Sequence, residues 1–186
     1  MAMTELTASG QTANILVVID TEYVKSNYSN PSKDPTKPTG INHNSQFMIA
    51  TGTRGIISGQ GTADLSFKLN VGDYASFTGT SVYANSDDAV IVYGIKYWSG
   101  TQVFNSFTPN VITRNRAVQP NPEQVANGGI PPLQTVQNFS SLDSKVGKSG
   151  TENFYVYFGL YTLGSDGQTQ NLFGYFYWDP TITVQG

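Results

Sequence analysis

The sequence predicts an all-β protein, a single antiparallel β-sandwich of jelly-roll-like type with long Pro- and Gly-rich loops. Its apolar residues come in short β-branched and aromatic bursts separated by Gly, Asn, Asp and Pro, and few segments sustain the 3.6-residue period of a long helix. A length of 186 residues suits one domain with a substantial core. No repeat or linker divides the chain, so we expect a flexible N-terminus over 1–13 and one domain over 14–186.

Eight bursts predict strands. The clearest lies near residue 67, where Leu65, Phe67, Leu69 and Val71 alternate with polar residues, as in a strand with one buried face and one wet face. Gly164 and Gly167 can supply the positive φ of a tight connection, so the last long strands should pair antiparallel. In chain order the predicted strands are 15–21, 46–51, 63–71, 74–83, 90–98, 153–162, 171–178 and 181–184.

Two proline-rich stretches interrupt the succession of predicted strands. Residues 26–39 contain three X-Pro pairs, which favour an extended loop with little room for helix or ladder. Residues 118–132 contain four prolines and two glycines. Long loops in a small domain are often functional or mobile, whereas the plainer interpretation is a solvated connection over the end of the sandwich.

The strands predicted near the C-terminus carry two unlike faces. Phe154, Val156, Phe158 and Leu160 fall on one face of their strand, and tyrosines fall on the other. In the next strand Leu172, Phe176 and Trp178 oppose Phe173 and two more tyrosines. Tyrosine combines a broad apolar ring with a polar tip, so this face suits a protein contact or a sugar-stacking platform, unless a loop covers it. The predicted interface residues are Tyr155, Tyr157, Tyr161, Tyr175 and Tyr177.

The composition favours self-association and excludes several partners. The chain is 12% aromatic and only 12% charged, so few like charges keep its copies apart. A net charge of −3 with scattered Lys and Arg gives no nucleic-acid footprint. The apolar run 15–19 is too short for a signal-peptide core or a membrane span. We therefore expect a cytoplasmic homo-oligomer with no signal peptide, no membrane contact and no nucleic-acid partner.

Ordinary enzyme chemistry has few residues to use. The chain has no cysteine and one histidine, His43, in the polar run 40–46. A loop histidine bonded to nearby backbone is the plainer interpretation, and a chain whose His43 is not catalytic is not expected to be an enzyme. Asp20 and Glu22 would share one side of a strand and so could not straddle a substrate. Gly147-Lys148-Ser149 lacks the earlier glycine of a phosphate-binding loop, and no Gly-x-Ser-x-Gly elbow is present.

Asp87 and Asp88, preceded by Asn85 and Ser86, offer hard oxygen ligands before a strand. Calcium would need several more oxygens and an EF-hand spacing that is absent, so a turn is the plainer interpretation and calcium is the one cofactor left open. Asn, Asp and aromatic groups in the two polar loops could also hold a carbohydrate. The candidate ligand-binding residues are Asp20, Glu22, Asn42, His43, Asn44, Asn85, Asp87 and Asp88.

Six blocks together resemble the PixA/AidA inclusion body protein family of host-associated bacteria. They are 19–23 (IDTEY), 39–47 (TGINHNSQF), 84–90 (ANSDDAV), 107–110 (FTPN), 150–155 (GTENFY) and 174–180 (GYFYWDP). The resemblance runs from about residue 14 to 184. It implies a cytoplasmic protein that accumulates, in some relatives as crystalline inclusions, under growth-phase or quorum-sensing control, and it supplies no catalytic residue.

Three functions follow as hypotheses. The first is a non-enzymatic, self-associating inclusion body protein with a role in host interaction or virulence. The second is a lectin-like carbohydrate-binding protein, assisted by calcium bound at Asp87 and Asp88. The third is a hydrolase that uses Asp20, Glu22 or His43.

Overall fold

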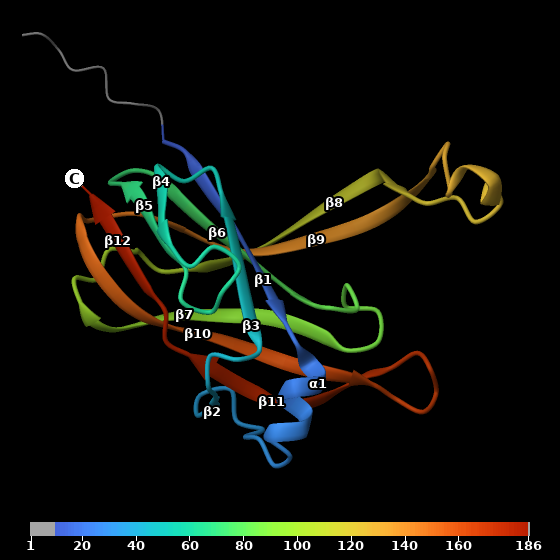
Figure 1. Ribbon diagram of the computed structural model, residues 1–186, viewed down its shortest axis with the longest axis horizontal. Helices are drawn as coiled ribbons and strands as arrows, with labels where there is room; N and C mark the ends of the chain where they lie inside the picture. The colour runs from blue at the N-terminus through green and yellow to red at the C-terminus, as the bar shows by residue number, and fades with distance from the viewer. Residues whose placement is uncertain (1–9, 186) are drawn as a thin grey trace, which may run out of the picture.

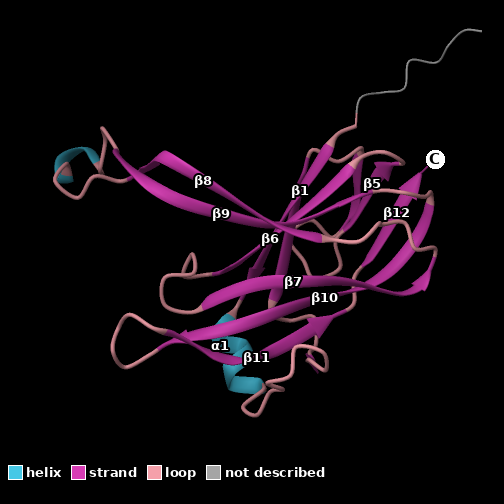
Figure 2. Ribbon diagram, turned by 180° about the vertical axis from the view of Figure 1, so that it is seen from behind, coloured by secondary structure: helices cyan, strands magenta, loops and turns pink. Residues whose placement is uncertain are grey.

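Two β-sheets face each other in the computed structural model, which describes residues 10–185 (Figure 1). One sheet has five strands in the order β3-β1-β6-β9-β8, and the other has seven, with β10 in its centre. Their inner faces pack together, whereas β8 and β9 continue past the body as a two-stranded projection (Figure 2). The predicted β-sandwich is confirmed.

The five-stranded sheet is built around β1 (Thr12–Ile19), which pairs antiparallel with β3 (Gln46–Thr51) and parallel with β6 (Tyr74–Ser81). β6 then pairs with β9 (Leu133–Lys145), and β9 pairs with β8 (Thr108–Gln119). Every second residue of β1 is buried, because alternate side chains of a strand point to opposite faces. The inward residues of β1 are Ala13, Ile15, Val17 and Ile19.

In the seven-stranded sheet, β10 (Gly150–Leu163) has β11 (Gln170–Trp178) on one side and both β7 (Ala89–Gly100) and β12 (Thr181–Gln185) on the other. The short β2 (Thr39–Gly40) extends the sheet beyond β11. β5 (Ser66–Asn70) pairs with β12, and β4 (Gly55–Ser58) pairs with β5. β12 therefore joins the β4–β5 pair to the rest of the sheet.

The core fills the space between the sheets with large side chains from both. Phe154, Phe158 and Leu160 of β10 are buried, as the alternation predicted. Phe77 of the five-stranded sheet meets Phe154 edge to face with ring centroids 6.2 Å apart. Trp178 of β11 has no exposed surface and lies 5.9 Å from the ring of Phe158. Such interdigitated rings account for much of the burial that holds a sandwich together.

All eight predicted strands occur in the structure, 46–51 with the predicted ends and the other seven with shifted ends. The pairing differs from the predicted antiparallel pattern, because β1 and β6, β11 and β2, and β12 and β5 run parallel. β1 begins at Thr12, inside the segment predicted to be flexible, and residues 1–9 of that segment lie outside the described part of the chain. A bulge after Leu160 shifts the hairpin register, so Phe173 packs on the core rather than on the tyrosine face.

The first predicted strand ends too late, because a helix starts where its last residues were expected. α1 (Thr21–Asn27) is capped by Asp20, whose side chain accepts the Tyr23 N–H at 3.0 Å. Asp at the N-cap and Glu22 in the first turn both complement the free N–H groups of a helix start. The prediction that Asp20 and Glu22 share one side of a strand is wrong. The irregular loop predicted over 26–39 is shorter, residues 28–38, because α1 takes its first two residues and β2 takes its last.

β8 and β9 were not predicted, and residues 118–132 are the far end of the hairpin that they form. This end contains a single 3-10 turn, η1 (Val125–Asn127), that the structure places at the tip of the projection (Figure 1). The sequence does not predict these strands because it is largely polar there and does not alternate cleanly between apolar and polar residues. No helix among residues 10–185 is long and apolar enough to cross a membrane.

Candidate functional site

Polar side chains gather around α1 at one end of the sandwich, which we call the polar end. The Tyr23 hydroxyl accepts hydrogen bonds from the side-chain amides of Asn42 and Asn44, at 3.0 and 3.1 Å. On the other side of the helix, Glu22 accepts from the Tyr83 hydroxyl at 3.1 Å. With Lys25, which pairs with Asp88, the helix thus joins the two loops predicted to bind a ligand, 42–44 and 85–88.

His43 bridges two carboxylates from other parts of the chain. Its Nδ1 lies 2.6 Å from Asp64 Oδ1, and its Nε2 lies 3.0 Å from Asp179 Oδ1. Burial lowers the pKa of His43, but the hydrogen bonds and charges of Asp179 and Asp64 outweigh it, so the pKa is raised above 6.5. With both ring nitrogens engaged, the imidazole has no free position for proton transfer to a substrate. The geometry favours a clamp that ties the loop before β3 to the loop before β5 and to the turn after β11.

This clamp should make stability depend on pH over a range that begins near 6.5 and extends upward through the raised folded-state pKa of His43. Because the folded-state pKa of His43 is raised, its contribution is complete below the unfolded pKa of 6.5 and is lost as pH rises through the folded pKa. We expect the free energy of unfolding of the wild type to exceed that of His43→Gln most at the acid side of this range. Urea unfolding of both proteins across the range measures the difference, and NMR titration of the single histidine gives its pKa. A difference that does not change with pH would contradict the clamp.

The acidic loop before β7 is held by internal bonds. The Asn85 side chain accepts the N–H groups of Ser81 and Val90, both at 2.9 Å, and its φ of +64° suits a tight turn. Asp88 is buried and pairs with Lys25 at 2.8 Å. Gln170 donates its amide to the carbonyls of Asn85, Ser86 and Asp87, so these oxygens already have a partner.

The calcium hypothesis uses the carboxylates of Asp87 and Asp88. Asp87 is exposed, whereas Asp88 is buried. Within residues 10–185, no group of three or more His, Cys, Asp or Glu side chains is placed to hold a metal ion. A bound calcium ion would therefore have to displace Lys25 from Asp88 or rely mainly on carbonyl and amide oxygens.

The predicted tyrosine face exists on the outer side of the seven-stranded sheet, and β7 adds two rings to it. Tyr93 lies 5.8 Å from Tyr157 and 5.4 Å from Tyr175, and Tyr155 lies 4.9 Å from Tyr177. Burial, then the neighbouring tyrosines, raise the pKa of Tyr93. The carbonyl oxygen of Pro35 accepts a hydrogen bond from the Tyr93 hydroxyl at 2.9 Å, so the loop before β2 lies over part of this face.

The uncovered end of this face carries Trp98. Its ring stacks on Tyr155 at 5.8 Å with planes 18° apart, and Trp98 keeps 46% of its surface exposed. The sequence predicts Trp98 in the strand 90–98 but does not assign it to the tyrosine face. All five predicted interface tyrosines, including Tyr161, are half-buried rather than fully exposed to solvent. The tyrosine face is thus partly covered near Tyr93 and open to solvent at Trp98.

The fold and its polar end define a mixed two-sheet β-sandwich protein with no metal cluster among the described residues. The profile of the PixA inclusion body protein family matches residues 11–184. A crystal structure of an inclusion body protein (PixA) from Burkholderia cenocepacia J2315 is 34% identical, with a TM-score of 0.77, over 97% of this chain and 99% of that one. A search of curated proteins finds no match. The chain belongs to the PixA inclusion body protein family, which is not known as enzymatic.

Proposed function

We propose that this chain is a non-enzymatic protein that accumulates in the cytoplasm by associating with copies of itself. The supporting observation is a surface that is poor in charge and rich in exposed apolar side chains. Val111, Val118, Val125 and Val136 each keep more than 60% of their surface exposed. All four lie in the β8–β9 hairpin, and exposed apolar side chains gathered on one element often mark a protein contact.

The polar end supports the non-enzymatic part of the proposal. Asp20 caps a helix, Glu22 pairs with Lys25, and both nitrogens of His43 are engaged. These groups stabilise loops, and none is paired with an unengaged nucleophile or base in the manner of hydrolytic sites.

Light scattering across a dilution series tests the self-association. We expect the weight-average mass to rise with concentration and to exceed that of the 20.1 kDa monomer. Association should persist in mild salt, because apolar contacts are less sensitive to screening than surface ion pairs. A protein that stays monomeric at every concentration would rule out the proposal.

A carbohydrate-binding module is the second candidate, favoured by the exposed Trp98 stacked on Tyr155. A saccharide ring could lie on the open side of Trp98, because apolar sugar faces pack on aromatic rings while hydroxyls bond to planar polar groups. A glycan array with and without chelator separates this function from self-association. Binding that is lost in Trp98→Ala would support it, and a blank array would remove it.

A further inference from the structure

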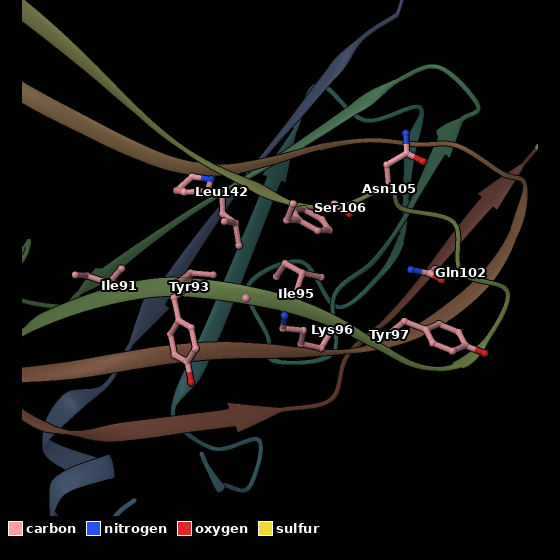
Figure 3. A pocket seen from close by; sticks show the side chains of 13 residues that line it. Ile91, Tyr93, Ile95, Lys96, Tyr97, Gln102, Asn105, Ser106 and Leu142 are labelled. Carbon is pink, nitrogen blue, oxygen red and sulfur yellow. The ribbon is translucent and has the colours of Figure 1, made fainter. Parts of the chain in front are cut away.

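Lys96 places a positive charge on the tyrosine face, close to its exposed indole. In the antiparallel pairing of β7 with β10, Lys96 lies directly opposite Tyr155, and the ring of Trp98 stacks on the same tyrosine. Residues opposite each other in such a pair point to the same face of the sheet. Figure 3 shows Lys96 on the same side of β7 as Tyr93 and away from Leu142. One tyrosine ring thus has an open indole and a lysine as its neighbours.

The ammonium group of Lys96 has no carboxylate partner in the described part of the chain. The ion pairs there use Lys25, His43 and Arg54. The stem of Lys96 lies over Gly94, with its Cε 3.3 Å from the position that a Cβ would take on that glycine. Lysine stems often cover apolar surface in this way while the charged end stays in water. An anionic ligand could therefore bind Lys96 without breaking an existing ion pair.

Hydroxyl groups near Lys96 are also without partners. The hydroxyls of Tyr155, Tyr157 and Tyr177 make no hydrogen bond to residues 10–185, whereas the hydroxyl of Tyr93 donates to the Pro35 carbonyl. None of these oxygens is a buried atom without a partner, so they face solvent. Each phenol group can both donate and accept a hydrogen bond. The tyrosine face therefore offers bonds to a ligand that is itself rich in hydroxyl groups.

A hollow of about 430 Å³ lies between these groups and the loop before β2. Its lining residues are Pro35, Thr36, Tyr93, Lys96 and Tyr157. Ligand pockets in proteins measure about 300–1,000 Å³, so this hollow has room for a group as large as a sugar ring. Lys96 also borders a separate cavity of about 420 Å³ at the edge of β7 (Figure 3).

The strands that form the tyrosine face carry one exposed charge. In β7, β10 and β11 the charged residues are Lys96 and Glu152. Glu152 is buried, and its carboxylate accepts the backbone N–H groups of Val103 and Phe104. Lys96 is therefore the charge that a ligand on these strands would meet, and it attracts a negatively charged group.

The acidic residues at the borders of this face are already compensated. Asp34 accepts the hydroxyl and the N–H group of Thr36 at 2.7 and 2.8 Å, and Lys37 lies close enough to help lower its pKa. Asp179, which follows β11, lies 3.0 Å from the Nε2 atom of His43. Both carboxylates thus have cationic or hydrogen-bonding partners, which weakens their repulsion of an anion near Lys96.

We infer that the tyrosine face binds an acidic saccharide, meaning one that carries carboxylate groups. One sugar ring lies on the open side of Trp98, the carboxylate of a neighbouring sugar pairs with Lys96 at the hollow, and sugar hydroxyls bond to the phenol groups. Aromatic rings pack on the apolar faces of sugars, and a charge-assisted hydrogen bond adds affinity and direction. The inference rests on the carbohydrate-binding function proposed above, names its ligand class, and requires no calcium.

A trimer of galacturonic acid and the matching neutral trimer of galactose test the ligand class by isothermal titration calorimetry. The acidic trimer should bind at least about tenfold more tightly, because a hydrogen bond to a charged group contributes more than a neutral one. Lys96→Gln should remove this preference, and Lys96→Arg should keep it. The matched control is Lys148→Gln, which removes the same charge from an exposed lysine outside the tyrosine face. It should bind both trimers like the wild type.

The two tryptophans report where the ligand lies. Trp178 is buried and donates its Nε1–H to the Ala63 carbonyl, whereas Trp98 is exposed. In NMR spectra of the ¹⁵N-labelled protein, the acidic trimer should shift the indole signal of Trp98 and leave that of Trp178 in place. Trp98→Ala should weaken the binding of the acidic trimer by about tenfold or more.

The outcomes separate this inference from the function on which it rests. A blank glycan array, with no binding of either trimer, would rule out carbohydrate binding and the inference with it. Equal affinity for the two trimers, unchanged in Lys96→Gln, would leave carbohydrate binding standing and rule out the acidic ligand. Binding that depends on Lys96 but does not shift the Trp98 signal would place the ligand in the cavity at the edge of β7 and contradict the inference. Circular dichroism of each variant shows whether it is folded.

Discussion

Trp178→Ala is expected to destabilise the protein by about 3–5 kcal/mol. The indole has no exposed surface, contacts Phe158, and donates its Nε1–H to the Ala63 carbonyl at 3.1 Å. Alanine would leave a cavity between the sheets and a buried carbonyl without its donor, and both cost free energy. Chemical denaturation measures the loss. For a chain of this size each kcal/mol should also lower Tm by about 2–4 °C.

Trp178→Phe is the matched control, because phenylalanine keeps most of the apolar volume and removes the N–H group. We expect Trp178→Phe to lower the free energy of unfolding relative to the wild type, but by less than Trp178→Ala does. If Trp178→Ala cost less than about 1 kcal/mol, the side chain could not be part of a packed core.

Asp73→Ala should be the second large effect, with a loss of about 3 kcal/mol. Asp73 is buried in the turn between β5 and β6. It accepts the N–H groups of Gln11 and Asn70 at 2.9 and 2.8 Å and two bonds from the Arg54 guanidinium at 2.9 and 2.7 Å. One carboxylate thus fastens the start of β1 and the approach to β4 to this turn. Its removal would take away the buried acceptor that these donors share.

The same carboxylate should make the protein sensitive to acid. The guanidinium of Arg54 and the two backbone N–H groups lower the pKa of Asp73 from 3.8 to about 2, despite burial. A lowered folded-state pKa contributes stability above the unfolded pKa, and this contribution is lost as pH falls from about 4 to about 2. The charge contributes about 2 kcal/mol, so the gap between wild type and Asp73→Asn should close over this range. Unfolding measured at several pH values follows it.

Asp166 provides the control for Asp73. Its pKa is also lowered to about 2, here by the Thr169 hydroxyl and the N–H groups of Thr169 and Gln168, but it lies exposed in the loop between β10 and β11. Water can replace its bonds, so Asp166→Ala should have a much smaller effect on stability than Asp73→Ala. Equal losses would mean that the burial of Asp73 is not what matters.

The sequence predicts the parts of this fold that alternation governs. β1, β5 and β10 each bury one side chain in two, and the hairpin glycines mark the β10–β11 connection. It does not predict β8 and β9, because β8 buries no side chain and β9 buries only Leu142 and Ser144 near its end, so neither strand carries the apolar alternation of a core strand. α1 was missed for a different reason: seven residues are too few for a helical period, and only the capping role of Asp20 distinguishes it from the end of a strand.

The candidate site shows the same limit. The two polar loops were predicted one by one, and the structure brings them together through Tyr23, Glu22 and Lys25 of α1. Asp64 and Asp179 could not be assigned to His43 from sequence, because they are 21 and 136 residues away along the chain. Whether these residues bind a ligand remains a prediction. The tyrosine face was predicted in composition, but its cover by Pro35 depends on where the loop before β2 lies.

The position of β12 has a consequence for how the chain folds during synthesis. β12 lies between β10 and β5 and is the link through which β4 and β5 join the larger sheet. Contacts between residues far apart in sequence are slow to form, and here they must wait for residues 181–185 to leave the ribosome. Until then, β5 and residues 150–153 of β10 lack this partner strand and remain open to other nascent chains. Rapid release of the chain from the ribosome and chaperone binding should therefore increase the yield of folded protein when it is made in large amounts.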